Sequence, residues 1–389
     1  MSYISSNNNR FYVAVEQNYG NAAAIAASNR IPAVKLITKQ QTDKLQRKDK
    51  TGSRTFLGYP SGLRKQTSFQ LNTYMETWGD QTVTPPHDPL FQACFGGAAM
   101  QSNGGTVATW TPPSAIGFTA PHGLAPGQAV SSGGEIRFVS AVVDGQNVQL
   151  NAPFTLPPAS NSQTSPTATY QPATNLPSIT LFDYWSPSTA VQRVIAGAAV
   201  NTLTIKVNGD FHEFDFTGQA CDLLDTSSFE NGQCGLSTFP PEPILSAINY
   251  AIIPGHLGQV WLGNAPQRFF TLTNAEVSFS NNLDLRAEEF GADLPSTIVP
   301  GQRSVALKFS IYQQDDAATA SLYQAARQRS PISVMIQLGQ QQGQLFGLYM
   351  TSVVAEVPEF DDSEKRQQWQ FQSCQAQGSS NDEIFVAFG

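Results

Sequence analysis

The sequence predicts a mainly β protein with two tandem β-sandwich or rolled-barrel domains, each with one short α-helix, plus a small inserted β-barrel domain. Composition is the first reason: only 13% of the 389 residues are charged, and the chain carries 30 Gly and 25 Pro. That balance favours short strands joined by turns over long helices, which prefer Ala, Leu, Glu and Lys. The second reason is an internal repeat, and the third is a set of short strands that interrupt it.

The C-terminal part of the chain repeats the N-terminal part. Residues Leu63–Tyr74 are echoed by Gly301–Tyr312, and both are alternating strands that end in tyrosine. A second match follows downstream, where Leu90–Cys94 reappears as Leu322–Ala326. Because the order is kept with only a small gap, a whole domain is the repeating unit, and internal self-similarity of this kind fixes the architecture.

The first domain is expected over residues 1–105 and 172–240. Apolar residues recur with period two, or in short runs, at 11–16, 33–37 and 178–183, and a closing hairpin joins 194–207 to 212–216. Residues 38–55 are too polar for a core and predict a long loop. A short helix is expected to start at Asp88 as the cap, with Pro89 at the first helical position.

The second domain is expected over residues 241–389 with the same elements. Its polar loop is 281–291, and its helix spans about Asp316 to Arg327, ending before Pro331. A strand over 332–337 and a hairpin from 345–357 to 369–371 complete the match.

Residues 106–171 are predicted to be an inserted small β domain and its linker. Strands at 117–124, 135–139 and 148–150 lie between Gly and Pro turns, and the Ser/Pro-rich stretch 157–166 predicts a linker back into the first domain. An insertion of this type is expected to project from the surface of its host, so that assembly should survive its deletion.

Charge is unevenly distributed along the chain. Residues 1–100 carry 11 Lys plus Arg against 6 Asp plus Glu, whereas residues 236–389 carry 8 against 15. A nucleic-acid surface is one interpretation of the basic first third, but acids interrupt its basic residues and no aromatic platform lies among them. The alternative is a basic surface of one repeat that meets an acidic surface of the other on another subunit.

The two polar loops carry the charges that would make such a contact between stacked rings. The candidate contact residues are Lys44, Arg47, Lys48 and Lys50 in the first loop and Asp284, Arg286, Glu288 and Glu289 in the second.

The search for reaction chemistry finds no catalytic, cofactor-binding or metal-binding constellation. His87, His122, His212 and His256 are isolated and read as surface or turn histidines. The cysteines Cys94, Cys221, Cys234 and Cys374 read as small buried hydrophobes, with a Cys221–Cys234 disulfide as the weaker alternative. Adjacent carboxylates at Glu288–Glu289 and Asp361–Asp362 do not face each other across a cleft, and solvated charge accounts for them. No apolar run is long enough to span a membrane, and the N-terminus lacks a signal peptide, so synthesis in a cytoplasm is expected.

The order of strand, polar loop, tyrosine-ended strand, helix and closing hairpin resembles the major tail tube proteins of long-tailed bacteriophages, of the type with two fused tube domains. The motifs that carry the resemblance are Tyr59–Tyr74, His87–Ala93 and Val194–Asn201. The likeness covers residues 11–105 with 172–235, and about 245–389. The inserted domain departs from the minimal pattern of that family.

The resemblance implies a structural protein of the virion and no enzyme. Three chains would form a ring with pseudo-six-fold symmetry, and rings would stack into the tube that conducts the genome. Implied partners are other copies of the chain, the terminator, distal tail and tape measure proteins, and double-stranded DNA in transit. Assembly would occur in the bacterial host cytoplasm, without membrane insertion. The alternatives are a distal tail or baseplate hub protein that forms a single ring, and a receptor- or carbohydrate-binding tail module based on the inserted domain.

Overall fold

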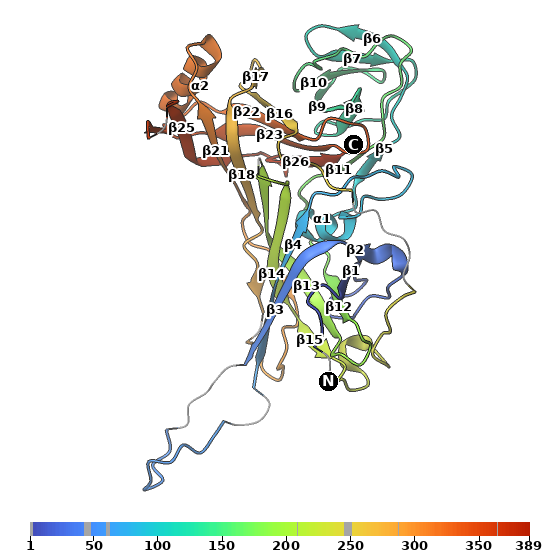
Figure 1. Cartoon of the computed structure of the whole chain (residues 1–389), viewed down its shortest axis with the longest axis vertical. Helices are drawn as coiled ribbons and strands as arrows, with labels where there is room; N and C mark the ends of the chain where they lie inside the picture. The colour runs from blue at the N-terminus through green and yellow to red at the C-terminus, as the bar shows by residue number, and fades with distance from the viewer. Residues whose placement is uncertain are drawn as a thin grey trace.

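The computed structural model is mainly β, with 44% strand and 7% helix. It describes residues 3–42, 48–59, 63–207, 209–244, 251–286, 288–363 and 365–389. We refer to residues 9–105 with 172–240 as the first half and to residues 251–389 as the second half. Figure 1 shows the two halves one above the other, with residues 106–158 beside the second half.

A single antiparallel ribbon of seven strands runs through both halves. Its spatial order is β3 (Ala33–Thr42), β4 (Lys65–Tyr74), β14 (Glu213–Ala220), β13 (Arg193–Val207), β18 (Leu272–Ser280), β21 (Ser304–Tyr312) and β25 (Gln368–Ala376). Side chains alternate between a buried and a more exposed face, as in β4, because successive residues of a strand point to opposite faces. The β13–β18 pairing joins the two halves.

Each half has a second layer of strands. In the first half this layer shares the long strand β13 with the ribbon. In the first half the order is β2 (Arg30–Ile31), β1 (Asn9–Val15), β12 (Ile179–Trp185), β13 and β15 (Asp222–Asp225). In the second half it is β17 (Gln267–Phe269), β16 (Gly258–Leu262), β22 (Ile332–Leu338), β23 (Phe346–Val354) and β26 (Phe385–Phe388). The end of β23 and then β24 (Glu359–Asp361) pair with β25 in one register. The order of pairing is therefore the same in both halves.

Each half carries one helix between matching strands. α1 spans Asp88–Phe95 and α2 spans Ala317–Gln328. The carboxylate of Asp316 caps α2 by accepting the Thr319 amide at 2.7 Å, as the sequence predicts. The prediction for α1 is off by one residue, because Asp88 is the first helical residue and His87 is the cap. α1 ends at Phe95, and Gly96 follows as the C-cap with a φ of +98°, which suits a residue without Cβ.

One continuous hydrophobic core extends through both halves. At its centre the Phe91 ring of α1 lies 5.4 Å from Phe214 of the first half and 5.8 and 5.2 Å from Phe346 and Phe388 of the second. Because these rings interlock, each half completes the core of the other.

The inserted segment forms a five-strand half-barrel with a small hydrophobic cluster of its own. Its order is β6 (Val107–Thr111), β7 (Ala115–Phe118), β10 (Asn147–Leu150), β9 (Glu135–Val142) and β8 (Ala129–Ser132). The stretch expected as a linker is hydrogen-bonded back to the half-barrel, as between Asn161 and Val107 at 2.8 Å. It leads into β11 (Thr167–Tyr170), which pairs with β26 of the second half and with β5 (Met100–Ser102).

The two long loops adopt different arrangements. The first continues the β3–β4 hairpin, with β3 extending to Thr42, and residues 48–59 reach away from the body of the molecule (Figure 1). The second loop folds back: β19 (Asp284–Leu285) pairs with β20 (Ile298–Val299), and the Lys65 amide donates to the Asp293 carbonyl at 2.9 Å. The second loop therefore lies against the base of the first loop, next to β4, within one chain.

Candidate functional site

The two outer edges of the seven-strand ribbon form the first candidate site. Within the described residues, no strand pairs with the outer side of β3, and none pairs with the outer side of β24. Unpaired edges offer a row of backbone donors and acceptors to another strand. At the seam between the halves the same kind of edge is already paired, from Thr202 opposite Ser280 to Val207 opposite Ala275.

Register shows that the free edges match the paired ones. Tyr74 lies opposite Glu213, and Tyr312 lies opposite Gln368. We take these two pairs as equivalent and compare the next strand on each side. The strand β18, beside β21, then corresponds to β3, beside β4. The strand β24, beside β25, corresponds to the end of β13, beside β14. The two free edges of the ribbon are therefore equivalent to the two strand edges that pair with each other at the seam.

Exposed apolar side chains gather on both free edges. Ile37 of β3 is 43% exposed, and Phe360 of β24 is 55% exposed. Val34 and Val357 lie on the same two edge segments and are also exposed. An unpaired edge with exposed apolar side chains is a surface on which a strand of another chain can pair.

The uncovered face of the ribbon is polar and nearly balanced in charge. Lys206 of β13 lies 3.5 Å from Glu213 and directly opposite Glu276, which in turn lies 3.7 Å from Lys308. This alternating row crosses the seam between the halves. The neighbouring positions of β4 on this face carry amides and a hydroxyl, Gln66, Ser68, Gln70 and Asn72. Such a face binds anions weakly, because it lacks a net positive patch.

Among the residues that the structure describes, the charged loop positions predicted from sequence are not gathered into one site. Lys44 and Arg47 lie outside the described residues, and Lys48 and Lys50 are exposed on the projecting loop. In the second loop Arg286 pairs with Glu289 at 3.6 Å, and Asp284 and Glu288 are exposed.

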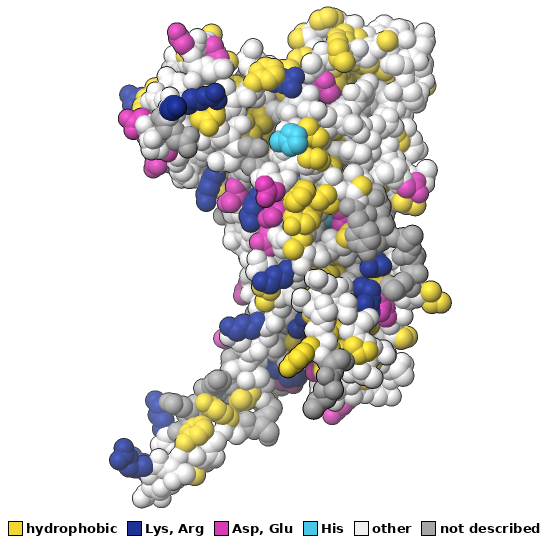
Figure 2. All heavy atoms as spheres, in the orientation of Figure 1, with side chains coloured by type: hydrophobic (Ala, Val, Ile, Leu, Met, Phe, Trp, Pro, Cys, Tyr) yellow, Lys and Arg dark blue, Asp and Glu magenta, His cyan; other side chains and the backbone are white. Residues whose placement is uncertain are grey.

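Contacts between the two loops are made by backbone groups and by residues that the sequence did not single out. Arg64 donates to the backbone carbonyls of Glu288 and Glu289 at 3.1 and 3.3 Å. Figure 2 shows hydrophobic side chains along the projecting loop as well as basic ones; Phe56, Leu57 and Tyr59 are exposed there. The sequence interpretation ended the polar loop at residue 55, so these three apolar residues fell outside it.

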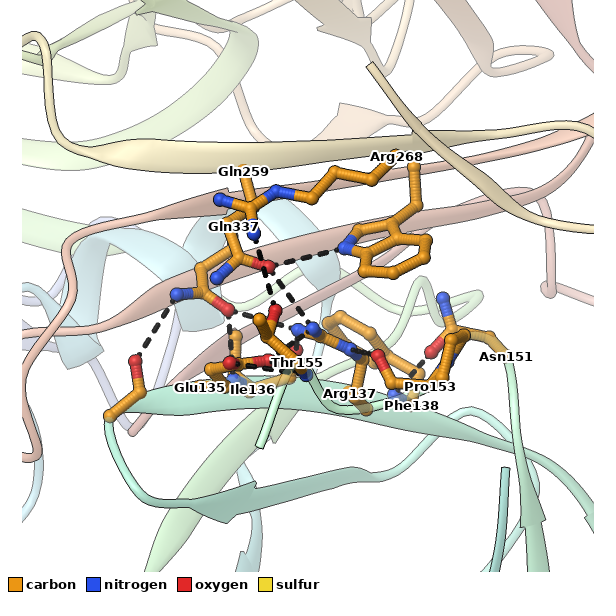
Figure 3. Close-up of polar contacts among 12 residues, drawn as sticks. Glu135, Ile136, Arg137, Phe138, Asn151, Pro153, Thr155, Gln259, Arg268 and Gln337 are labelled. Carbon is orange, nitrogen blue, oxygen red and sulfur yellow. Dashed lines mark hydrogen bonds and ion pairs between the residues drawn. The ribbon is translucent and has the colours of Figure 1, made fainter. Parts of the chain in front are cut away.

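A buried polar cluster joins the half-barrel to the second half (Figure 3). The Arg137 side chain of β9 is fully buried and forms an ion pair with Glu135. Its guanidinium also donates to Gln337 at 3.0 Å and to Gln259 at 3.1 Å, both of the second half. Burial lowers the pKa of Arg137 to about 10, against the opposing effect of Glu135, so it stays charged at neutral pH.

Apolar contacts surround this cluster. The guanidinium carbon of Arg137 lies 5.3 Å from the centre of the Phe154 ring and 5.2 Å from that of Trp261. Phe138 stacks on Tyr349 at 5.5 Å. The half-barrel is therefore packed onto the second half along its inner side, which corrects the expectation that it only projects from its host. No sequence signal marked Arg137, because an arginine in a short strand reads as exposed.

Two of the four histidines correct the expectation of surface positions. His87 is fully buried, shares a hydrogen bond of 2.7 Å with the Thr73 hydroxyl and stacks against Phe388. His212 is buried as well. Burial lowers the pKa of His87 to about 4. His122 is partly exposed, and its Nδ1 accepts the Leu124 amide at 2.8 Å.

The described part of the chain holds no group of three or more His, Cys, Asp or Glu side chains placed to bind a metal ion. All four cysteines are free, so Cys221 and Cys234 form no disulfide. Within the described ranges no helix has the length and apolar character needed to cross a membrane. No model of a known protein family matches the chain, and no curated protein matches it.

Proposed function

We propose that this chain is a structural protein of the virion, a duplicated tail tube protein whose rings stack into the tail tube of a long-tailed bacteriophage. The observation that carries the proposal is the seam. β13 of one half pairs with β18 of the other, and the chain ends in the same two kinds of edge, at β24 and β3.

Repeating the seam between chains makes an assembly. A head-to-tail contact closes into a ring if its rotation divides the circle, and otherwise runs on as a filament. Three chains with two tube domains each would make a ring with pseudo-six-fold symmetry. The tandem tube domains correspond to the two halves, with residues 106–171 as the added domain.

The polar face of the ribbon suits the wall of a conduit for double-stranded DNA. DNA binds clustered Lys and Arg through counterion release, and each phosphate contact strengthens binding. Lys206 and Lys308 are instead neutralised by Glu213 and Glu276. DNA would then pass without sequence-specific binding.

The projecting loop supports stacking. Residues 48–59 extend beyond the body of the chain (Figure 1). They carry basic and apolar side chains. A neighbouring ring is the partner within reach of such a loop, and the terminator, distal tail and tape measure proteins would meet the ends of the stack. The proposal includes no catalytic residue, cofactor or metal, and places assembly in the bacterial host cytoplasm. A distal tail or hub protein would close the same ring without stacking it.

Negative-stain microscopy of the purified chain tests the proposal. We expect rings and stacked rings from the unaltered chain, and monomers from Ile37→Lys, because a charge at the β3 edge opposes strand pairing. Val143→Lys, at an exposed apolar position of the half-barrel, is the matched control and should keep the rings. A chain that stays monomeric at every concentration contradicts the proposal, and single rings that never stack favour the hub alternative.

A further inference from the structure

The free end of the second half carries a cluster of three aromatic side chains, of which Trp369 is buried, Tyr323 is partly buried and Phe360 is exposed. Tyr323 of α2, Phe360 of β24 and Trp369 of β25 lie with ring centres 5.3 to 6.0 Å apart. Phe360 is 55% exposed. The Trp369 Nε1 is buried and has no hydrogen-bond partner, although a buried indole N–H normally has one. We call these three residues the aromatic corner.

The matching place in the first half is fully covered. Phe91 of α1 lies 5.4 Å from Phe214, as Tyr323 lies 5.3 Å from Trp369. Phe91 is nevertheless fully buried, because Phe346 and Phe388 of the second half lie against it. Within the chain, the surface that matches the aromatic corner is therefore closed by the following half.

We propose that the aromatic corner is the docking surface for the first half of a second copy of this chain. The proposal rests on the proposed ring, and it names side chains that would hold the chain-to-chain contact in addition to backbone pairing. The occupant follows from continuity with the seam. At the seam, β18 pairs with β13 and its half covers α1 and β14. A strand that pairs with β24 in the same way brings its own half over α2 and β25.

Register places individual residues across this contact. At the seam, Ile205 of β13 lies opposite Val277 of β18. Phe360 holds the place of Ile205, and Thr38 of β3 holds the place of Val277. Phe360 of one copy should therefore lie opposite Thr38 of the next. The Thr38 hydroxyl is also buried without a hydrogen-bond partner.

The contact between copies should be more polar than the seam within a copy. At the seam, Phe95 of α1 stacks on Phe279 of β18 at 4.7 Å. The corresponding residues at the free ends are Arg327 of α2 and Gln40 of β3, and Gln40 donates to Asp222 at 2.8 Å. An exposed arginine would thus approach an amide and a carboxylate. An apolar seam suits a permanent join, whereas a mixed surface suits one formed after each chain has folded.

The first experiment compares two substitutions of exposed phenylalanines in the second half. Phe360→Ser alters the aromatic corner, and Phe270→Ser is the matched control, because Phe270 is exposed elsewhere in the same half. Sedimentation velocity over a concentration series measures association, and circular dichroism checks the fold. We expect the dissociation constant between copies to rise at least about tenfold for Phe360→Ser and to be unchanged for Phe270→Ser.

A second experiment tests the register directly. In a full chain with Cys234→Ser, the pair Thr38→Cys and Phe360→Cys should form a disulfide between copies under mild oxidation, because opposed strand residues lie at disulfide distance. Covalent oligomers on a non-reducing gel are expected from the double variant only. This readout holds even if Phe360→Ser proves unstable.

The outcomes separate this proposal from the proposed function. Rings that form equally well with Phe360→Ser, together with no specific cross-link, overturn the aromatic corner and leave the ring intact. An unaltered chain that never associates overturns both. Association of a different protein at the corner, with no effect of Phe360→Ser on rings, would also overturn docking of a second copy.

Discussion

The second layer of each half has a matching apolar face, and a different part of the chain covers that face in each half. By register, five positions of the first half match five of the second: Tyr12, Phe182, Tyr184, Val194 and Leu224 match Trp261, Met335, Gln337, Tyr349 and Phe385. In the first half, side chains from residues 22–25 and 229–239 pack over this face. In the second half, the half-barrel inserted into the first half covers it.

The comparison shows that an apolar sheet face must be covered, whereas the segment that covers it can change. Over the first half, Arg10 forms an ion pair with Glu242, which lies just beyond that half in the chain, and over the second half the half-barrel carries the Arg137–Glu135 pair. Gln259 holds the place of Arg10, so the second half has no arginine at this position of the sheet, and Arg137 of the half-barrel donates to Gln259 instead. The half-barrel therefore completes the fold in addition to any role at the surface.

The largest effect is expected from removing this cover. Replacing residues 106–164 by a short Gly/Ser bridge keeps β11 but exposes Trp261, Met335, Tyr349 and Phe385. Each such side chain contributes about 1.5–3 kcal/mol when buried, so the sum approaches the whole stability of a domain, about 5–15 kcal/mol. We expect aggregation on size-exclusion chromatography and strong binding of a hydrophobic dye.

Residues 48–59 provide the control deletion, because most of their side chains are exposed. Their removal should leave the thermal transition unchanged. A soluble half-barrel deletion with a normal transition would contradict the covering role and restore the simpler expectation of a dispensable insertion.

The two arginines sharpen the comparison. Arg137→Met leaves the buried Glu135 carboxylate without its ion-pair partner, and breaking a buried pair costs about 3–5 kcal/mol. Arg10→Met is the matched control, with a smaller expected loss because the Arg10 and Glu242 side chains are 14% and 22% exposed. Urea unfolding gives both values. Equal losses of unfolding free energy would mean that the two ion pairs contribute equally to stability.

Acid should act on the first half through His87. Its pKa is about 4 in the folded chain, because burial disfavours the charged ring, against about 6.5 when unfolded. As pH falls from 6.5 to 4, protons bind mainly to the unfolded state, so the unfolding free energy drops by up to about 1.4 kcal/mol per pH unit. His87→Gln should remove this slope in urea titrations at successive pH values. An unchanged slope would assign the acid sensitivity elsewhere.

The smallest effect is expected at Glu16, which follows β1. Its carboxylate accepts hydrogen bonds from Gly197 at 2.7 Å, from Ser178 and Thr180 at 2.6 Å each, and from Gly20 at 3.0 Å. Gly197 is a bend in β13 with φ of +64°.

In the second half the position in register with Glu16 is Ala265, which has no carboxylate to hold the matching strand. Glu16→Gln replaces one acceptor oxygen by a donor and should cost about 1–3 kcal/mol in thermal unfolding. Glu213→Gln, at a more exposed pair, is the control. An unchanged thermal transition in Glu16→Gln would show that the bend of β13 at Gly197 does not depend on the Glu16 carboxylate.

Local signals predicted the longer elements well. β4, β21, α2 and the hairpins of both halves lie where alternation, proline and the Asp316 cap place them. The strands β15, β16, β17 and β26 were missed, because segments of three to five residues show too little periodicity to read. The nine-residue strand β18 was missed as well. Their positions depend on pairing with strands far away in the chain.

What the sequence by itself determined is the mainly β class, the repeated order of elements and the place of the insertion, because strand alternation and turn residues act over a few neighbours. Only the tertiary structure decided which edges stay free, that His87 is buried and that Arg137 of the half-barrel completes the second half. These features depend on contacts between residues distant in sequence, such as Arg137 with Gln259 and Gln337, and no local pattern of charge or hydrophobicity encodes them.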